Sequence, residues 1–144
     1  MGFFMIDYKS KVDEMILAAK DNAFFIGTTD KRYIDQIETL LEVKLPEEYK
    51  WFISKYGHGF VYSVFILGVG KDKSLVCANE TLIKRQAGLP KNLVVVENCD
   101  EWVYCIDCDN GEVLMWSAWD GISDYCYNSF LEYLLDRIKE TVEN

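Results

Sequence analysis

The side chains best suited to chemistry in this sequence are five cysteines and one histidine. Cys105 and Cys108 have the CxxC spacing that redox centres and halves of zinc sites use. A redox pair would open a helix, where the dipole lowers the thiol pKa, whereas this pair ends an expected strand and runs into a turn. A zinc site needs further ligands, and the sequence holds no second CxxC, although Cys99 and Cys126 could contribute through space. We therefore expect buried, reduced thiols, with no metal and no cofactor.

The other candidates for catalysis have simpler structural explanations. His58 follows the expected end of a helix and lies between two glycines, and the sequence has neither a GxSxG elbow nor a recognisable cysteine-hydrolase signature. The glycines of LGVGKDKS, residues 67–74, lack the four-residue gap of a P-loop and indicate a turn between strands. No acidic segment has EF-hand spacing. We expect His58 to be a capping or surface residue and the protein not to be an enzyme.

Negative charge is concentrated in the second half of the chain. The formal net charge is −9, and residues 97–136 contain ten acidic residues and no Lys or Arg. Such a surface repels phosphate backbones, which argues against direct binding of nucleic acid. It would attract a basic protein and speed the encounter with it. The alternative is a soluble acidic protein whose charged face is only solvated.

Aromatic side chains accompany this charge. Trp102 and Tyr104 share one face of an expected strand, and Trp116 and Trp119 lie in or just after the next strand. Aromatic residues inside a polar rim are common anchors of protein interfaces, although any one of these rings could instead belong to the core. The candidate partner-binding residues are the charge donors Glu97, Asp100, Glu101, Asp109, Asp120 and Asp124 and the anchors Trp102 and Trp119.

Length and composition favour one globular domain over residues 1–144. Half of the residues are hydrophobic, and the chain has only two prolines and nine glycines, which leaves little room for a linker. The first eleven residues, MGFFMIDYKSK, do not match a signal peptide, and no apolar run reaches the roughly 20 residues that span a bilayer. We expect a cytoplasmic protein that does not bind membranes.

The first half of the sequence predicts three helices. Apolar periodicity favours helices over residues 8–20 and 31–42, the second preceded by capping residues. Pro46 suits the first turn of a third helix, which Gly57 would end. The apolar piece 24–26 could be a strand or a packed loop.

The second half predicts several strands, one short helix at 80–87 and a final helix. Asp109-Asn110-Gly111 is a strong hairpin signal, and Ser129 begins a capping box for the last helix. The expected strands are 60–67, 74–78, 93–97, 101–107 and 112–118. This order predicts an α+β fold: a mostly antiparallel sheet with N-terminal helices, one inserted short helix and a C-terminal helix.

The segment IETLLEVKLPEEYKWFISKYGHGF closely resembles the signature of the SUKH superfamily, which is also known from fungal regulators of cell-wall glucan synthesis. NGEVLMW, residues 110–116, looks like the family's glycine–strand–Trp segment, and SFLEYLLDRI, residues 129–138, is similar to its closing helix. The matching positions of the signature are Ile37, Leu41, Leu45, Pro46, Tyr49, Phe52, Ile53, Tyr56 and Gly57.

This resemblance implies an α+β fold without catalytic residues and, for small bacterial members, an immunity role. Such proteins bind and neutralise a toxin that is delivered between competing cells, often a nuclease domain. Together with the acidic surface, this favours a partner that is a basic, nuclease-like toxin domain, whose cleft would meet carboxylates in place of phosphates. The alternatives are a cytoplasmic adaptor related to cell-wall synthesis and a metal or redox protein using Cys105 and Cys108.

Overall fold

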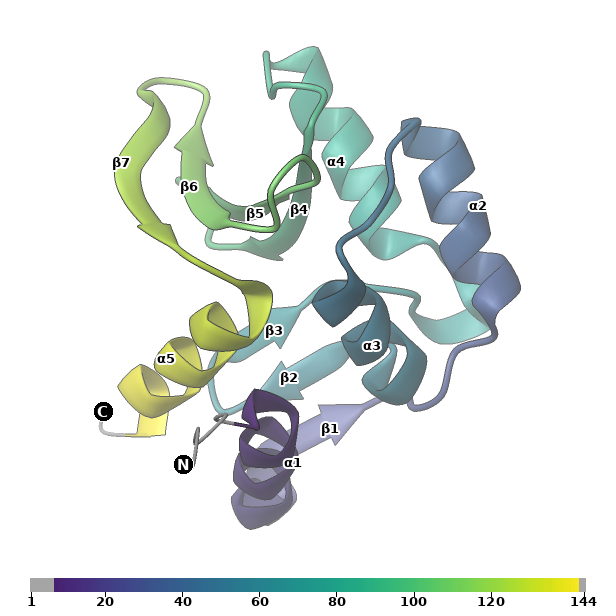
Figure 1. Ribbon diagram of the computed structural model, residues 1–144, viewed down its shortest axis with the longest axis vertical. Coiled ribbons are helices and arrows are strands. Elements are labelled where there is room, and N and C mark those ends of the chain that lie inside the picture. The colour runs from purple at the N-terminus through teal and green to yellow at the C-terminus, as the bar shows by residue number, and fades with distance from the viewer. Residues whose placement is uncertain (1–6, 143–144) are drawn as a thin grey trace, which may run out of the picture.

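The structure is a computed structural model of the chain that describes residues 7–142, without the side chain of Tyr125 (Figure 1). Residues 1–6, which begin the segment compared with a signal peptide, and residues 143–144 lie outside the described range. Within this range, five helices and two antiparallel sheets surround one cluster of buried apolar side chains. The α+β class is confirmed.

The three predicted N-terminal helices are present, and polar side chains begin the first two. They are α1 (Tyr8–Ala19), α2 (Lys31–Leu41) and α3 (Glu47–Tyr56). The carboxylate of Asp7 accepts a hydrogen bond from the backbone N–H of Ser10, and that of Asp30 accepts one from the N–H of Arg32. A short 3₁₀ turn, η1 (Lys20–Asn22), follows α1.

The first sheet has the order β1-β2-β3, with β1 (Ala23–Phe25), β2 (Gly59–Val61) and β3 (Val64–Ile66). The apolar piece at 24–26 is therefore a strand. The single strand predicted over 60–67 is wrong, because the chain reverses at Tyr62, whose φ is +53°. This turn lacks Gly, Pro, Asn and Asp, and Ser63 is its one weak turn signal.

An inserted helix, α4 (Val76–Gln86), follows the turn η2 (Lys71–Lys73). The strand predicted over 74–78 is wrong, since residues 76–78 already belong to this helix, and the predicted helix at 80–87 is longer at its start. The hydroxyl of Thr81 donates to the carbonyl of Cys77 at 2.7 Å and accepts from the N–H of Val95 at 2.9 Å. This buried residue fixes α4 against the second sheet.

The second sheet is a meander in the order β4-β5-β6-β7, seen at the upper left of Figure 1. Its strands are β4 (Leu93–Asn98), β5 (Val103–Asp107), β6 (Val113–Ser117) and β7 (Gly121–Tyr127). The predicted hairpin at residues 109–111 joins β5 to β6, whereas β7 had no predicted counterpart. The N–H of Leu67, after β3, donates to the carbonyl of Val96 at 2.8 Å and links the two sheets.

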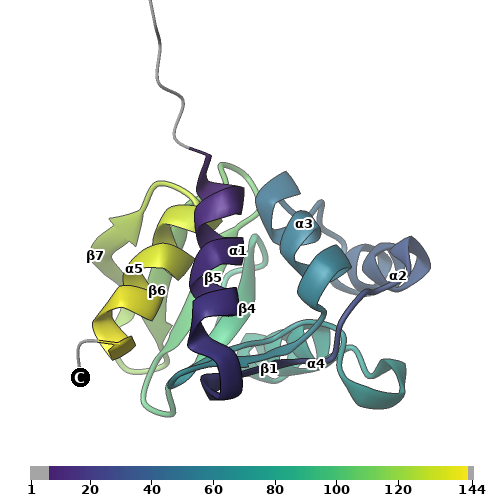
Figure 2. The same ribbon diagram turned by 90° about the horizontal axis from the view of Figure 1, so that it is seen from below.

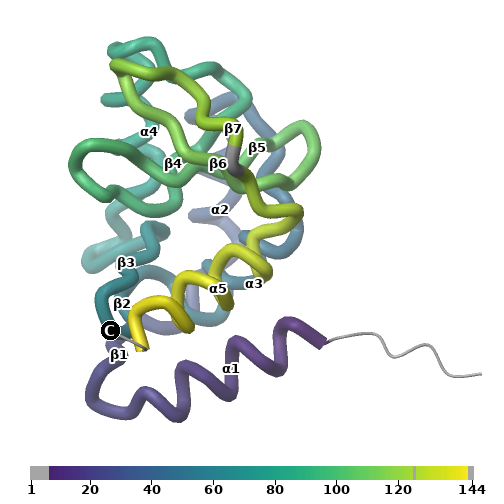
Figure 3. Tube along the Cα trace, turned by 90° about the vertical axis from the view of Figure 1, so that its left-hand side faces the viewer, coloured from purple at the N-terminus to yellow at the C-terminus, as the bar shows by residue number. Residues whose placement is uncertain are grey.

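The final helix α5 (Phe130–Val142) buries the predicted face formed by Phe130, Leu134 and Ile138. The hydroxyl of Ser129 accepts from the N–H of Glu132, which confirms the N-terminal half of the capping box. Figures 2 and 3 show α5 lying beside α1. Among residues 7–142, each helix is too short or too polar to cross a membrane.

The signature helix α3 is part of this scaffold. Tyr49 is fully buried, and its hydroxyl donates to the carbonyl of Leu67 at 2.6 Å. Phe52 packs on the ring of Phe130, which joins α3 to α5. The conformation and burial of α3 therefore follow from packing, as its apolar spacing predicts.

Candidate partner-binding site

The meander places two of its turns at the same end of the second sheet. In antiparallel strands that follow one another, alternate turns lie at one end, so the β4–β5 turn and the β6–β7 turn are neighbours while the β5–β6 turn lies at the other end. Five predicted partner-binding residues lie on the two neighbouring turns, and Asp124 follows on β7. We call this end of the sheet the acidic rim: Asp100, Glu101, Trp102, Trp119, Asp120 and Asp124.

Local hydrogen bonds shape the β4–β5 turn. The side-chain oxygen of Asn98 accepts from the N–H of Asp100 at 2.9 Å, and Asp100 has a left-handed φ of +67°. The N–H of Cys99 donates to the carbonyl of Trp102 at 2.9 Å, which closes the turn. Asx-type turns of this kind let Asn and Asp replace glycine where the backbone must reverse.

The β6–β7 turn is closed in a similar way. The hydroxyl of Ser117 accepts from the N–H of Asp120 at 3.0 Å, and Gly121 follows with a φ of +70°. Further along, the register between β6 and β7 shifts: Leu114 faces Cys126, whereas Trp116 faces Ile122. A bulge of this kind bends the strand and redirects its side chains. In this protein the irregular stretch includes Asp124.

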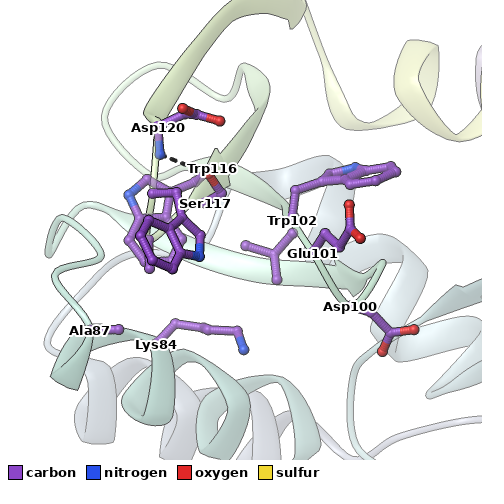
Figure 4. A pocket seen from close by; sticks show the side chains of 11 residues that line it. Lys84, Ala87, Asp100, Glu101, Trp102, Trp116, Ser117 and Asp120 are labelled. Atoms are coloured by element: carbon purple, nitrogen blue, oxygen red, sulfur yellow. Dashed lines mark hydrogen bonds between the residues drawn. The ribbon is translucent and has the colours of Figure 1, made fainter.

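The first cavity of the rim, about 510 Å³, lies between the two turns and α4. Figure 4 shows Lys84 extending below Trp116, with Asp120 above it and Trp102 and Glu101 on the opposite side. Lys84 is the basic residue of this lining, and its Nζ lies 3.3 Å from a carboxylate oxygen of Glu80.

A second cavity, of about 470 Å³, shares a wall with the first. Glu101, Trp102, Trp116 and Asp120 are among the residues that line both cavities, while Asp124 lines the second alone. The lining of the second cavity contains no Lys or Arg. We refer to these two neighbouring cavities together as the recess.

The carboxylates of the rim are available to a partner. Asp100, Glu101, Asp120 and Asp124 are all exposed. Within residues 7–142, none of these four carboxylates forms an ion pair with a Lys or Arg side chain. Unpaired carboxylates gathered on one edge produce a negative local potential, which falls off over roughly 10 Å at moderate salt.

The three tryptophans of the recess differ in burial. Trp116 is 5% exposed and fixed in the sheet, Trp102 is half-buried, and Trp119 is 95% exposed at the tip of its turn. The indole N–H of Trp102 is buried and has no hydrogen-bond partner among the described residues. A large, fully exposed ring is costly to keep in water and is typical of an interface anchor.

Two of the predicted partner-binding residues do not belong to the rim. Glu97 is 2% exposed, and its carboxylate accepts from the hydroxyl of Tyr133 at 2.6 Å and from the guanidinium of Arg137 at 2.6 and 3.0 Å. The prediction that Glu97 donates charge to a partner is wrong, because this carboxylate is buried and already paired. Asp109 is exposed but lies at the β5–β6 turn, at the opposite end of the sheet.

The recess also contains residues that were not predicted. Trp116 pairs with Val103 across β5 and β6, so the register of the predicted hairpin could have placed it beside Trp102. Lys84 comes from α4, and its position depends on how that helix packs on the sheet. Nothing in the sequence around Lys84 indicates this position.

Cys105, Cys108 and His58 occupy scaffold positions, whereas Cys126 is exposed, so the expectation of buried thiols is wrong for Cys126. Cys105 is buried in β5, and burial raises the pKa of its thiol; burial likewise raises the pKa of Cys108 to about 12. Such thiols carry little thiolate at neutral pH, which disfavours nucleophilic chemistry. The Nδ1 atom of His58 accepts from the N–H of Gly68 at 3.1 Å, and desolvation lowers the pKa of this half-buried imidazole. Among the residues that the structure describes, no three His, Cys, Asp or Glu side chains lie together as a metal site.

Fold and recess together define an α+β domain with an acidic, aromatic surface at one end of an antiparallel sheet. The chain matches the family SUKH_5, described as SMI1-KNR4 cell-wall, over residues 9–139, and it belongs to this family. It is also similar to the crystal structure of a protein from Pseudomonas syringae pv. tomato. That similarity has a TM-score of 0.71 at 21% identity and covers 86% of this chain and 96% of the other, which supports the fold.

Proposed function

We propose that this protein is an immunity protein that binds a toxin domain with a basic surface and neutralises it by covering its active site. The observation that carries the proposal is the acidic rim, where two turns and β7 gather four exposed carboxylates that form no ion pair within residues 7–142, beside the exposed ring of Trp119. Membership of the SUKH_5 family supports the proposal at the level of the domain.

The proposed mechanism is steric and electrostatic. A cleft that binds phosphates presents cationic side chains at fixed positions, and the carboxylates of the rim would occupy those positions in place of substrate. The attraction raises the rate of encounter, and the exposed Trp119 anchors the complex after contact. The scaffold residues of α3 take no part in this contact.

Survival of cells that express a toxin tests this function. A candidate basic nuclease toxin domain from the same genome would be expressed from an inducible promoter in a bacterial host, with and without the present chain. We expect the chain to restore colony formation and to form a stoichiometric complex with the purified toxin domain. Toxicity that persists although both proteins are soluble and present in equal amounts would refute the proposal.

A cytoplasmic location is part of the proposal, since the protected target would lie there.

The description of the family as SMI1-KNR4 cell-wall favours a second candidate, an adaptor in cell-wall synthesis. The adaptor would bind a cellular protein through the same rim but would not change survival in the presence of a toxin. Deletion of the gene distinguishes the two functions: an adaptor predicts altered sensitivity to cell-wall antibiotics without any toxin, whereas an immunity protein predicts sensitivity only when the toxin is delivered.

A further inference from the structure

The second cavity of the acidic rim has the chemistry of a site for a cationic side chain. Its lining includes the carboxylates of Glu101, Asp120 and Asp124, and no basic residue. The first cavity differs, because Lys84 extends into it. A cation entering the second cavity meets three carboxylates and no like charge from the lining.

The aromatic residues that line the second cavity also favour a cationic side chain. Trp102 and Trp116 line the same cavity, and the 5% exposure of Trp116 shows that its ring is held in place by packing. A cation over an indole face is attracted by the negative charge of the ring, and a planar guanidinium can also stack on it. Ile122 adds apolar surface that suits the methylene groups of a long side chain.

These features distinguish arginine from lysine. A guanidinium presents five N–H donors in a plane, so it can stack on an indole while it donates to carboxylates at its edge. An ammonium is a compact, strongly hydrated charge that makes no stacking contact. A cavity that combines indole walls with several carboxylates therefore favours the guanidinium.

We propose that the second cavity receives one arginine side chain of the partner, with the guanidinium against Trp102 and paired with Glu101 and Asp120. This inference rests on the proposed function, since it assigns one contact within the complex with a basic partner.

Titration with short peptides tests the site without the toxin. The probes are acetyl-Gly-Arg-Gly-amide, the same peptide with lysine, and the same peptide with citrulline, which keeps the planar shape and loses the charge. The indole N–H signals of Trp102 and Trp116 would be followed by ¹⁵N NMR, with assignment from Trp102→Phe and Trp116→Phe. We expect the arginine peptide to shift both signals and to bind at least about tenfold more tightly than the citrulline peptide, since charge-assisted hydrogen bonds are lost.

Two double variants separate a specific site from general attraction. E101Q/D120N removes two carboxylates of the cavity, whereas E14Q/D21N removes two exposed carboxylates from α1 and η1, at the far end of the molecule in Figure 1. We expect the first variant to lose about tenfold in affinity for the arginine peptide and the second to match the wild type, with unchanged thermal midpoints for both. Equal binding of the lysine or citrulline peptide, or equal losses in the two variants, would overturn the inference.

The survival experiment then separates this inference from the proposed function. If the arginine peptide fails to bind while the wild-type chain still protects cells, the arginine site is wrong and the immunity role stands. If the peptide binds as expected while protection is absent, the cavity is a guanidinium site and the immunity role is wrong.

Discussion

Two glutamates four residues apart show how much the environment of a side chain decides. Glu97 is enclosed by the second sheet and α5, where Tyr133 and Arg137 satisfy its carboxylate. Glu101 lies on a turn, is exposed, and lines both cavities of the rim. In the sequence, charge alone made Glu97 and Glu101 equivalent candidates. Their burial separates them, because the buried Glu97 belongs to the scaffold.

We predict that Glu97→Gln destabilises the fold without removing a contact to the partner. Loss of the carboxylate leaves the guanidinium of Arg137 without its buried partner, which costs on the order of 3 kcal/mol in the free energy of unfolding. Urea denaturation measures this cost. The control is Glu140→Gln. Glu140 is the second ion-pair partner of Arg137, and its side chain is 55% exposed, so its loss should cost less than about 1 kcal/mol. Similar costs for the two variants would contradict the burial argument.

We predict that protonation of His58 lowers the stability of the folded state in acid. Its Nδ1 accepts a hydrogen bond and burial lowers its pKa, so the folded state binds the proton less readily than the unfolded state, in which the pKa is near 6.5. This contribution to stability is present above that pKa and is lost as the pH falls below it. Because the chain has one histidine, the comparison with His58→Gln is direct. The stability advantage of the wild type over this variant should shrink between about pH 7.5 and about pH 5.5, and a constant difference would contradict the prediction.

At the scale of elements, the sequence predicted the parts that carry strong local signals. Capping residues and apolar periodicity located α1, α2, α3 and α5 to within one residue at their starts. The start of α4 was mistaken for a strand, because Leu75-Val76-Cys77 is a short apolar run and Leu75 provides no side-chain cap. The hairpin of β2 and β3 was missed because a tyrosine, rather than a glycine, turns the chain.

The candidate site was predictable in composition and not in arrangement. The rim depends on two turns meeting at one end of the meander, and one of them precedes β7, which had no predicted counterpart. Because β7 was not predicted, the sequence could not indicate that Asp120 and Asp124 line the same cavity as Trp102. The position of Lys84 depends on packing between α4 and the sheet, a long-range property that no local pattern encodes.

We predict that Thr81 is essential for the contact between α4 and β4. Thr81→Val keeps the shape of the side chain but leaves the buried N–H of Val95 without its acceptor, which should cost about 1–3 kcal/mol in the free energy of unfolding. Thr81→Ser keeps the hydroxyl and is the matched control. Chemical denaturation of both variants measures the difference, and a valine variant as stable as the wild type would show that the hydrogen bond contributes nothing.

The whole molecule has a strongly uneven distribution of charge. Residues 97–136 hold ten of the 24 acidic residues and none of the 15 basic ones, so they carry −10, while the remainder of the chain carries 15 − 14 = +1. The net charge of −9 therefore arises in one segment. Four of these ten carboxylates, those of Asp100, Glu101, Asp120 and Asp124, lie together on the acidic rim, so under the proposed function a basic partner would be attracted to that end of the sheet.

We predict that E101Q/D120N slows association with the toxin domain by roughly threefold or more and weakens the dependence of the rate on salt. Stopped-flow mixing at several salt concentrations measures both quantities. The variant E14Q/D21N changes the net charge equally and should associate almost as fast as the wild type. If the two variants slow association to the same extent, net charge rather than the rim sets the rate.

The turns that form the rim pack on the scaffold through Cys99 and Trp102, whereas Asp100, Glu101, Trp119 and Asp120 are exposed. Each closes a hairpin whose strands are fixed by the core, and the left-handed φ angles of Asp100 and Gly121 restrict which residues fit at these two positions. The other exposed positions of the turns can be exchanged at little cost to folding, and insertions are tolerated since the closure entropy of a loop grows slowly with its length. Under the proposed function, the surface that contacts the partner could therefore vary while the buried scaffold stays the same. If the toxin changes, substitutions in the exposed positions of these two turns could restore binding without any change in the buried residues.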